Sequence, residues 1–146
     1  METITTLLSH QHHGCDKLFA QAEASIANNQ WESATHAFER FLAAMERHFS
    51  LEEQILFPQV EDQIGHTSGP TAVMRMEHQQ IRQILTEMAE YITAHDPESY
   101  LGLAETLLIL MQQHNAKEEQ ILYPLSDNLL SNELPALLEQ LRQPGN

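Results

Sequence analysis

The chain has 146 residues, 42% of them hydrophobic, and carries a formal net charge of -14 from 21 acidic residues against 7 lysines and arginines. This length suits one globular domain, and no apolar run approaches a membrane span, so we expect a single soluble domain over residues 1–146. The acidic excess disfavours nucleic acid and anionic membranes as partners, because both bind clustered cations.

Apolar residues recur at helical spacing almost throughout the chain. Their repeat of three or four residues predicts amphipathic helices over residues 3–28, 31–57, 71–94, 98–123 and 132–142. "NN", "GHTSGP" and "HDP" separate the first four helices, and Pro58 distorts or ends the second. No segment shows the two-residue alternation of a strand. The predicted fold is therefore all-α: an antiparallel up-down-up-down four-helix bundle with a short C-terminal fifth helix.

A seven-residue phrase occurs twice in the predicted helices. "EEQILFP" begins at Glu52, and "EEQILYP" begins 66 positions later at Glu118. In each copy a histidine precedes the first glutamate by four residues, which places both side chains on one helix face: His48 and His114. We expect this face to be the core face, because it continues an apolar stripe through Met45 and Ile55, and through Met111 and Ile121. The second glutamate of each phrase lies about 100° round the helix and is expected to face solvent: Glu53 and Glu119.

The same 66-residue shift relates the first predicted helix to the third. It lays His12 on His78, whereas His13 falls on a glutamine, so the repeat selects His12 from the cluster "HQHH". All four selected histidines lie on apolar stripes and at about the same height in an antiparallel bundle. His13 is the alternative if the first helix is rotated. The remaining histidines are expected on the surface: His10, His36, His66 and His95.

Buried imidazoles and carboxylates need compensating partners, because burial penalises polar and charged groups. A metal removes this penalty, and imidazole is the commonest side-chain metal ligand. Six ligands exceed a tetrahedral zinc site and suit two divalent ions bridged by carboxylates. We predict two iron ions (Fe²⁺/Fe³⁺), replaceable by manganese or zinc, held by His12, His48, Glu52, His78, His114 and Glu118. The alternative is a set of core histidines and glutamates that satisfy one another by hydrogen bonds.

Four segments resemble the signature segments of the hemerythrin-like, HHE cation-binding domains: "HHGCDKLF", "HFSLEEQILFP", "MRMEHQQI" and "HNAKEEQILYP". The resemblance covers about residues 8–125. It implies that the six residues ligate a non-haem di-iron centre, with Glu52 and Glu118 as bridges. Four histidines with two glutamates are more similar to the iron-centre repair proteins of this superfamily, which respond to nitrosative and oxidative stress, than to the five-histidine oxygen carriers, because Met74 stands four residues before His78.

The predicted function is therefore that of a di-iron protein that binds or reacts with O2, NO or peroxide, in stress response, sensing or iron handling. No acid–base or nucleophilic constellation is visible, so the sequence does not decide whether the protein is an enzyme. The competing hypothesis is a non-catalytic binding or regulatory module in which zinc or another divalent ion stabilises the fold. The sequence names no protein partner.

Cys15, Tyr123 and Phe57 lie close in sequence to the predicted ligands. Cys15 is expected to be a small core residue rather than a redox thiol. Tyr123 and Phe57 are expected to close the end of the bundle. The N-terminal "METITTLLSHQHHG" lacks a basic leader with a long apolar core, and a lone cysteine agrees with a reducing compartment, so we expect a cytoplasmic location.

Overall fold

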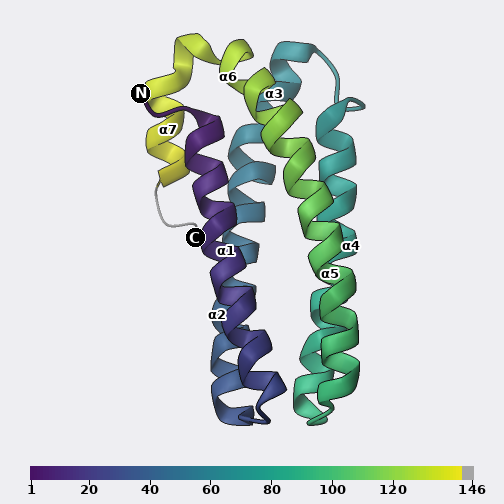
Figure 1. The fold of residues 1–146 in the computed structure, drawn as a ribbon. Helices are drawn as coiled ribbons and strands as arrows, with labels where there is room; N and C mark the ends of the chain where they lie inside the picture. The colour runs from purple at the N-terminus through teal and green to yellow at the C-terminus, as the bar shows by residue number, and fades with distance from the viewer. Residues whose placement is uncertain (143–146) are drawn as a thin grey trace.

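The computed structural model describes residues 1–142, and this part of the chain consists of helices joined by short turns and loops, without strands. Four long helices lie side by side (Figure 1): α1 (Ile4–Ala27), α2 (Trp31–Leu51), α4 (Pro70–Thr93) and α5 (Pro97–Lys117). Shorter elements gather at one end: α3 (Phe57–Ile64), α6 (Tyr123–Leu129), a 3-10 turn (Ser131–Glu133) and α7 (Leu134–Arg142). The prediction of an all-helical fold built by helix-on-helix packing is confirmed.

The long helices form two hairpins that pack against each other. α1 packs along α2 and α4 along α5, while α1–α5 and α2–α4 contacts join the hairpins. Thr3 caps α1, and Asp96 caps α5 by accepting from the Ser99 backbone N–H at 3.1 Å. The Asp127 carboxylate of α6 accepts from the backbone N–H of Ile4 at 2.7 Å. This hydrogen bond connects the first turn of α1 to α6, which follows the α4–α5 hairpin.

Two apolar clusters fill the interior, and a polar layer separates them. One cluster includes Cys15, Met45, Ile81 and Met111, and the other includes Leu8, Leu51, Met74 and Leu122. On α1, α2 and α4 a buried histidine stands between a residue of the first cluster and a residue of the second, and on α5 His114 stands between Met111 and the Leu122 of the turn that follows. The fold therefore brings four histidines to one level, as predicted from their heights along the helices.

Both copies of the repeated phrase contain a π-helical turn. These turns span Glu52–Leu56 and Glu118–Leu122. The Phe57 N–H donates to the Glu52 carbonyl, and the Tyr123 N–H donates to the Glu118 carbonyl, so each bond reaches back five residues rather than four. A π turn inserts one extra residue into a helix and often marks a functional site.

The inserted residue changes which side chains face the core. Ile121 is 62% exposed and Ile55 is half-buried, whereas Leu122 and Leu56 are buried. Our placement on the apolar stripe was wrong for Ile121, because it assumed an unbroken α-helix, whereas Ile55 still packs against the edge of the core. The helical path also continues past Pro58 to Ile64 and past the second phrase to Leu129, so the predicted ends at residues 57 and 123 were too early. Proline is tolerated there because it lies in the first turn of a new α-helical segment.

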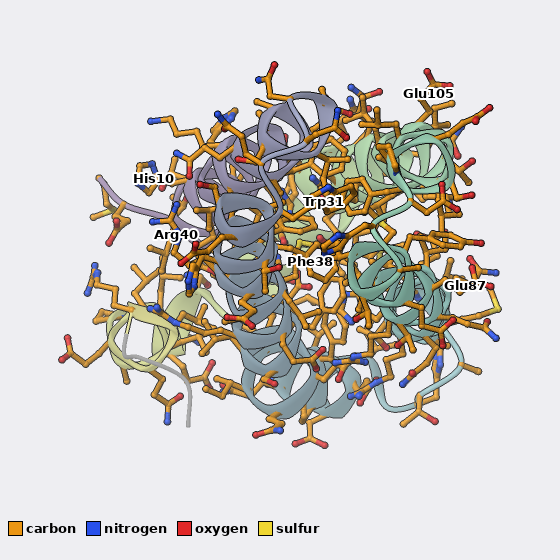
Figure 2. All side chains as sticks on the ribbon, turned by 90° about the horizontal axis from the view of Figure 1, so that it is seen from below. His10, Trp31, Phe38, Arg40, Glu87 and Glu105 are labelled. Carbon is orange, nitrogen blue, oxygen red and sulfur yellow. The ribbon has the colours of Figure 1, made fainter. Side chains whose placement is uncertain are left out.

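Many charged side chains lie on the outside of the molecule. Figure 2 looks along the bundle and shows Glu87 and Glu105 projecting outward, while Phe38 is buried. The histidines that we assigned to the surface are all exposed: His10, His36, His66 and His95. Among the described residues, no helix has the length and apolar character required to cross a membrane.

Candidate metal centre

The six predicted ligands meet in the polar layer between the two apolar clusters. The exposed fraction of each is at most 4%: His12, His48, Glu52, His78, His114 and Glu118. His12 Nε2 lies 3.1 Å from His48 Nε2 and 3.1 Å from Glu118 Oε1. His13 is exposed, so the rotated alternative for α1 does not describe this structure.

These six residues form two overlapping groups of potential ligands. His12 and His48 define one group, His78 and His114 define the other, and both glutamates belong to each. Within a group, one ligand atom from each residue lies within 4.8 Å of all the others. The structure thus brings the six predicted residues together as candidate ligands, while the bridging of two ions by the two glutamates stays a prediction.

Each histidine is held by a hydrogen bond on the ring nitrogen that faces away from the centre. His12 Nδ1 lies 2.6 Å from a Glu119 carboxylate oxygen, and His78 Nδ1 lies 2.7 Å from Glu53. The same contact pairs His48 Nδ1 with Gln11 Oε1 at 2.7 Å and His114 Nδ1 with Glu77 at 2.8 Å. Carboxylate and amide oxygens only accept, so each Nδ1 donates its proton, and Nε2 is the ring nitrogen that can offer a lone pair to a metal ion once it is deprotonated. This is the outer hydrogen bond typical of metal-binding histidines.

The outer carboxylates are the functional residues that our sequence reasoning missed. We expected Glu53 and Glu119 to face solvent, but their side chains are 19% and 35% exposed and bind histidines of neighbouring helices. Basic side chains hold two of the outer carboxylates in place. Arg82 donates to Glu53 at 2.8 Å, and Lys117 donates to Glu77, the partner of His114, at 2.5 Å. The recurrence of a second glutamate in both phrases was the signal that could have identified them.

Several inward-facing atoms of the centre have no hydrogen-bond partner. Among the described residues these are Glu52 Oε1, His78 Nε2, His114 Nε2 and Glu118 Oε2. His78 Nε2 lies only 3.0 Å from Glu52 Oε1, but the two are not aligned as donor and acceptor. Unpaired buried polar atoms are rare in native proteins and indicate a missing ion or other partner. The donor set and its geometry therefore fit metal ions.

The pKa values of the two buried glutamates, Glu52 and Glu118, are shifted in opposite directions. Burial raises the pKa of Glu52, and the charge of Glu118 raises it further. Burial also acts to raise the pKa of Glu118, but Glu52, His114 and His12 outweigh it and lower that pKa. In the metal-free protein their shared site therefore pushes the pKa values of the two carboxyl groups apart, upward for Glu52 and downward for Glu118. A divalent cation between them favours ionisation of both.

The histidines also differ in pKa. Burial lowers the pKa of His48 to about 3. Burial acts to lower the pKa of His114 as well, but its contacts with Glu118 prevail and raise the pKa to about 9. The pKa values of His12 and His78 are raised in the same way, against burial, by Glu118 and by Glu52 respectively. In the metal-free protein at neutral pH, a proton on the His114 imidazole therefore balances part of the carboxylate charge.

Tyr123 contributes directly to the centre, which we did not predict. It is fully buried, and its hydroxyl donates to Glu52 Oε2 at 2.5 Å. The Tyr123 hydroxyl oxygen also lies 2.9 Å from Glu118 Oε1 and 3.1 Å from His12 Nε2. Phe57 occupies the equivalent position in the other half, where its ring stacks on His78 with centroids 5.8 Å apart. Both residues are buried in the apolar cluster that includes Leu8 and Leu122, which agrees with the expectation that they close the bundle end, and the contacts of the Tyr123 hydroxyl are additional to it.

Cys15 lies beside the centre as a buried free thiol. Burial raises its pKa to about 12, so the thiol stays protonated at neutral pH. This agrees with the expected role of a small core residue, because a thiolate is the reactive form of cysteine.

By fold and site, this chain is a helical metal-binding protein with a buried histidine–glutamate centre. The hemerythrin family, described as the hemerythrin HHE cation binding domain, matches residues 3–126, and the chain belongs to this family. The predicted resemblance is confirmed, and the family implies a bound metal cation. No curated protein and no solved structure matches the chain.

Proposed function

We propose that the protein is an antiparallel four-helix bundle that holds a non-haem di-iron centre and binds or reacts with O2, NO or peroxide in stress response, sensing or iron handling. The observation that carries this proposal is the sharing of Glu52 and Glu118 by two pairs of buried imidazoles. Two cations held by these overlapping groups would both be neighbours of the two carboxylates, whose negative charge would offset the repulsion between them.

The donor set supports iron as the metal. Four imidazole nitrogens and two carboxylates are borderline to hard ligands, which suit iron and also accept manganese or zinc. A bound iron pair would supply two electrons and open coordination positions. The six residues would hold the ions, with Glu52 and Glu118 as bridges.

The chain itself contributes orientation, charge and exclusion of water. The four outer hydrogen bonds keep each Nε2 directed inward. The two apolar clusters cover the polar layer from both sides and so keep the dielectric constant low. Tyr123 is the one hydroxyl donor at the centre among the described residues, and it orients Glu52.

Metal reconstitution tests the proposal. Metal-free protein is incubated anaerobically with ferrous iron, freed of excess metal and exposed to air, and metal per chain and absorption spectra are then measured. We expect two irons per chain and near-ultraviolet bands of an oxidised iron pair. A colourless protein that holds one zinc ion and no iron would instead support the metal-stabilised binding module.

A cytoplasmic location and small-molecule partners belong to the same proposal. The buried free Cys15 is compatible with a reducing compartment, and the net charge of -14 makes nucleic acid and anionic membranes poor partners. Fractionation of the native host with blotting for the protein tests the location.

A further inference from the structure

The two hairpins are related by the 66-residue shift, so each feature of one half has a counterpart in the other. The six inner residues and all four outer acceptors follow this relationship in position: Glu53 corresponds to Glu119, and Gln11 corresponds to Glu77, where the residue type differs. The relationship extends to the two surface depressions that flank the outer hydrogen bonds of His48 and His114. The depressions have the same place but different sizes.

The depression beside His48 is an open cavity between α1 and α2. Its volume is about 190 Å³, and its walls include Gly14, Cys15, Leu18 and Ala44. Gly14 is exposed at the mouth, and a side chain there would meet open space, since nothing lies within 4 Å of an added Cβ. The floor is formed by His48 together with Gln11, whose amide oxygen is occupied by His48 Nδ1.

The corresponding depression between α4 and α5 is nearly filled. It measures about 30 Å³ beside His114. The reason is visible in the sequence, because the 66-residue shift replaces each small wall residue by a larger one: Gly14 by Gln80, Cys15 by Ile81 and Ala44 by Leu110. The larger side chains at these three positions therefore account for the smaller volume of the depression between α4 and α5.

A small internal space lies between the open cavity and the centre, and Cys15 and His48 line both spaces. The internal space measures about 10 Å³. Its other walls include His12 and His114, so it reaches both groups of candidate ligands. Space of this size holds about one water-sized molecule, which limits what can pass.

The geometry points to the cavity between α1 and α2 as the entry route and holding site for a small uncharged molecule, of the size of O2 or NO, on its way to the centre. The walls are mostly apolar, and Arg47, the charged side chain among the described lining residues, is exposed at the rim. Apolar walls favour uncharged guests over ions, because an ion would lose hydration there. The role of the guest rests on the proposed function, whereas the cavity can be tested without any metal.

The first experiment fills the cavity with the residues of the closed half. In the variant Gly14→Gln with Ala44→Leu, we expect the ferrous protein to react with O2 and with NO about tenfold more slowly, while iron per chain stays unchanged. Gly102→Gln is the matched control: Gly102 lies on α5, where an added Cβ also meets nothing within 4 Å, and its rates should equal those of the wild type. An unchanged rate in the filled variant overturns the inference. Gly14→Gln alone repeats the test if the double variant melts early.

The second experiment needs no metal. Crystals of the metal-free protein are pressurised with xenon, an uncharged apolar probe that binds in protein cavities. We expect a xenon atom beside Cys15 and Ala44 in the wild type and none there in the filled variant. Absence of xenon from this cavity in the wild type overturns the inference. A protein that binds xenon here but takes up no iron would refute the proposed function alone.

Discussion

The Tyr123 hydroxyl donates to Glu52 Oε2 at 2.5 Å, across the interface between the two hairpins. The other half of the repeat has Phe57 at the same position, so only one hydroxyl enters the centre from the two equivalent sites. The two halves therefore supply matching metal ligands but unequal hydrogen-bond donors.

Replacing Tyr123 with phenylalanine removes this donor from a buried carboxyl group. We expect the metal-free Tyr123→Phe protein to lose about 1–3 kcal/mol of unfolding free energy, because a buried partner is left unsatisfied. Urea unfolding at neutral pH measures the loss. Tyr100→Phe is the control, since the Tyr100 hydroxyl is buried without a hydrogen-bond partner and its removal should cost little or stabilise the fold. Equal losses in both variants would contradict the role given to the Tyr123 hydroxyl.

The outer carboxylates should control metal affinity without touching the metal. We expect Glu53→Ala and Glu119→Ala each to weaken divalent metal binding by roughly 10–100-fold, because loss of the outer bond frees the imidazole ring to turn. The corresponding glutamine variants should lose much less, since Gln11 shows that an amide oxygen can hold a histidine Nδ1. Competition titration with a chelating dye measures these affinities.

An exposed glutamate provides the comparison for this series. Glu87 projects from α4 into solvent (Figure 2), so Glu87→Ala removes the same charge without touching a histidine. Its metal affinity should equal that of the wild type. A comparable loss in Glu87→Ala would mean that overall charge, rather than ring orientation, sets the affinity.

The core faces of the long helices were predictable from sequence up to the repeated phrases. His48 and Glu52 follow Met45 at steps of three and four, and α2 is a regular helix to Leu51, so periodicity alone gave their orientation. Periodicity failed after Glu52, because a π turn leaves no mark in the apolar pattern until the stripe moves from Ile55 to Leu56. Our prediction assumed regular α-helical geometry beyond Glu52, where the π turn begins.

Contacts between helices were harder to predict than faces of single helices. Glu53 binds His78 of α4, and Glu119 binds His12 of α1, so neither bond appears as a spacing within one helix. Tyr123 presents the same difficulty, because its hydroxyl reaches Glu52 of the other hairpin. The 66-residue repeat already contained part of this information, since the second glutamate recurs with the first.

Metal affinity should rise with pH. In the metal-free protein the pKa of His114 is about 9, so at neutral pH its imidazole carries a proton that must leave when a divalent ion binds. The affinity therefore falls as pH falls below about 9, by about tenfold per pH unit for each proton released. His48 releases none, because its pKa is lowered to about 3. Zinc titration calorimetry in buffers of different ionisation enthalpy measures the released protons, and an affinity independent of pH would contradict this account.

Replacing a shared glutamate should reduce metal binding at both candidate positions, whereas replacing a histidine should reduce it at one. Glu52 and Glu118 belong to both ligand groups, whereas His114 belongs to one. We therefore expect Glu52→Ala or Glu118→Ala to reduce metal below one ion per chain and His114→Ala to leave about one, because only the glutamates serve both positions. Metal analysis and the rise in Tm on metal addition measure this, with Glu105→Ala, an exposed site on α5 (Figure 2), as the control. If metal content and the rise in Tm both survive either glutamate substitution, that glutamate is not a bridge.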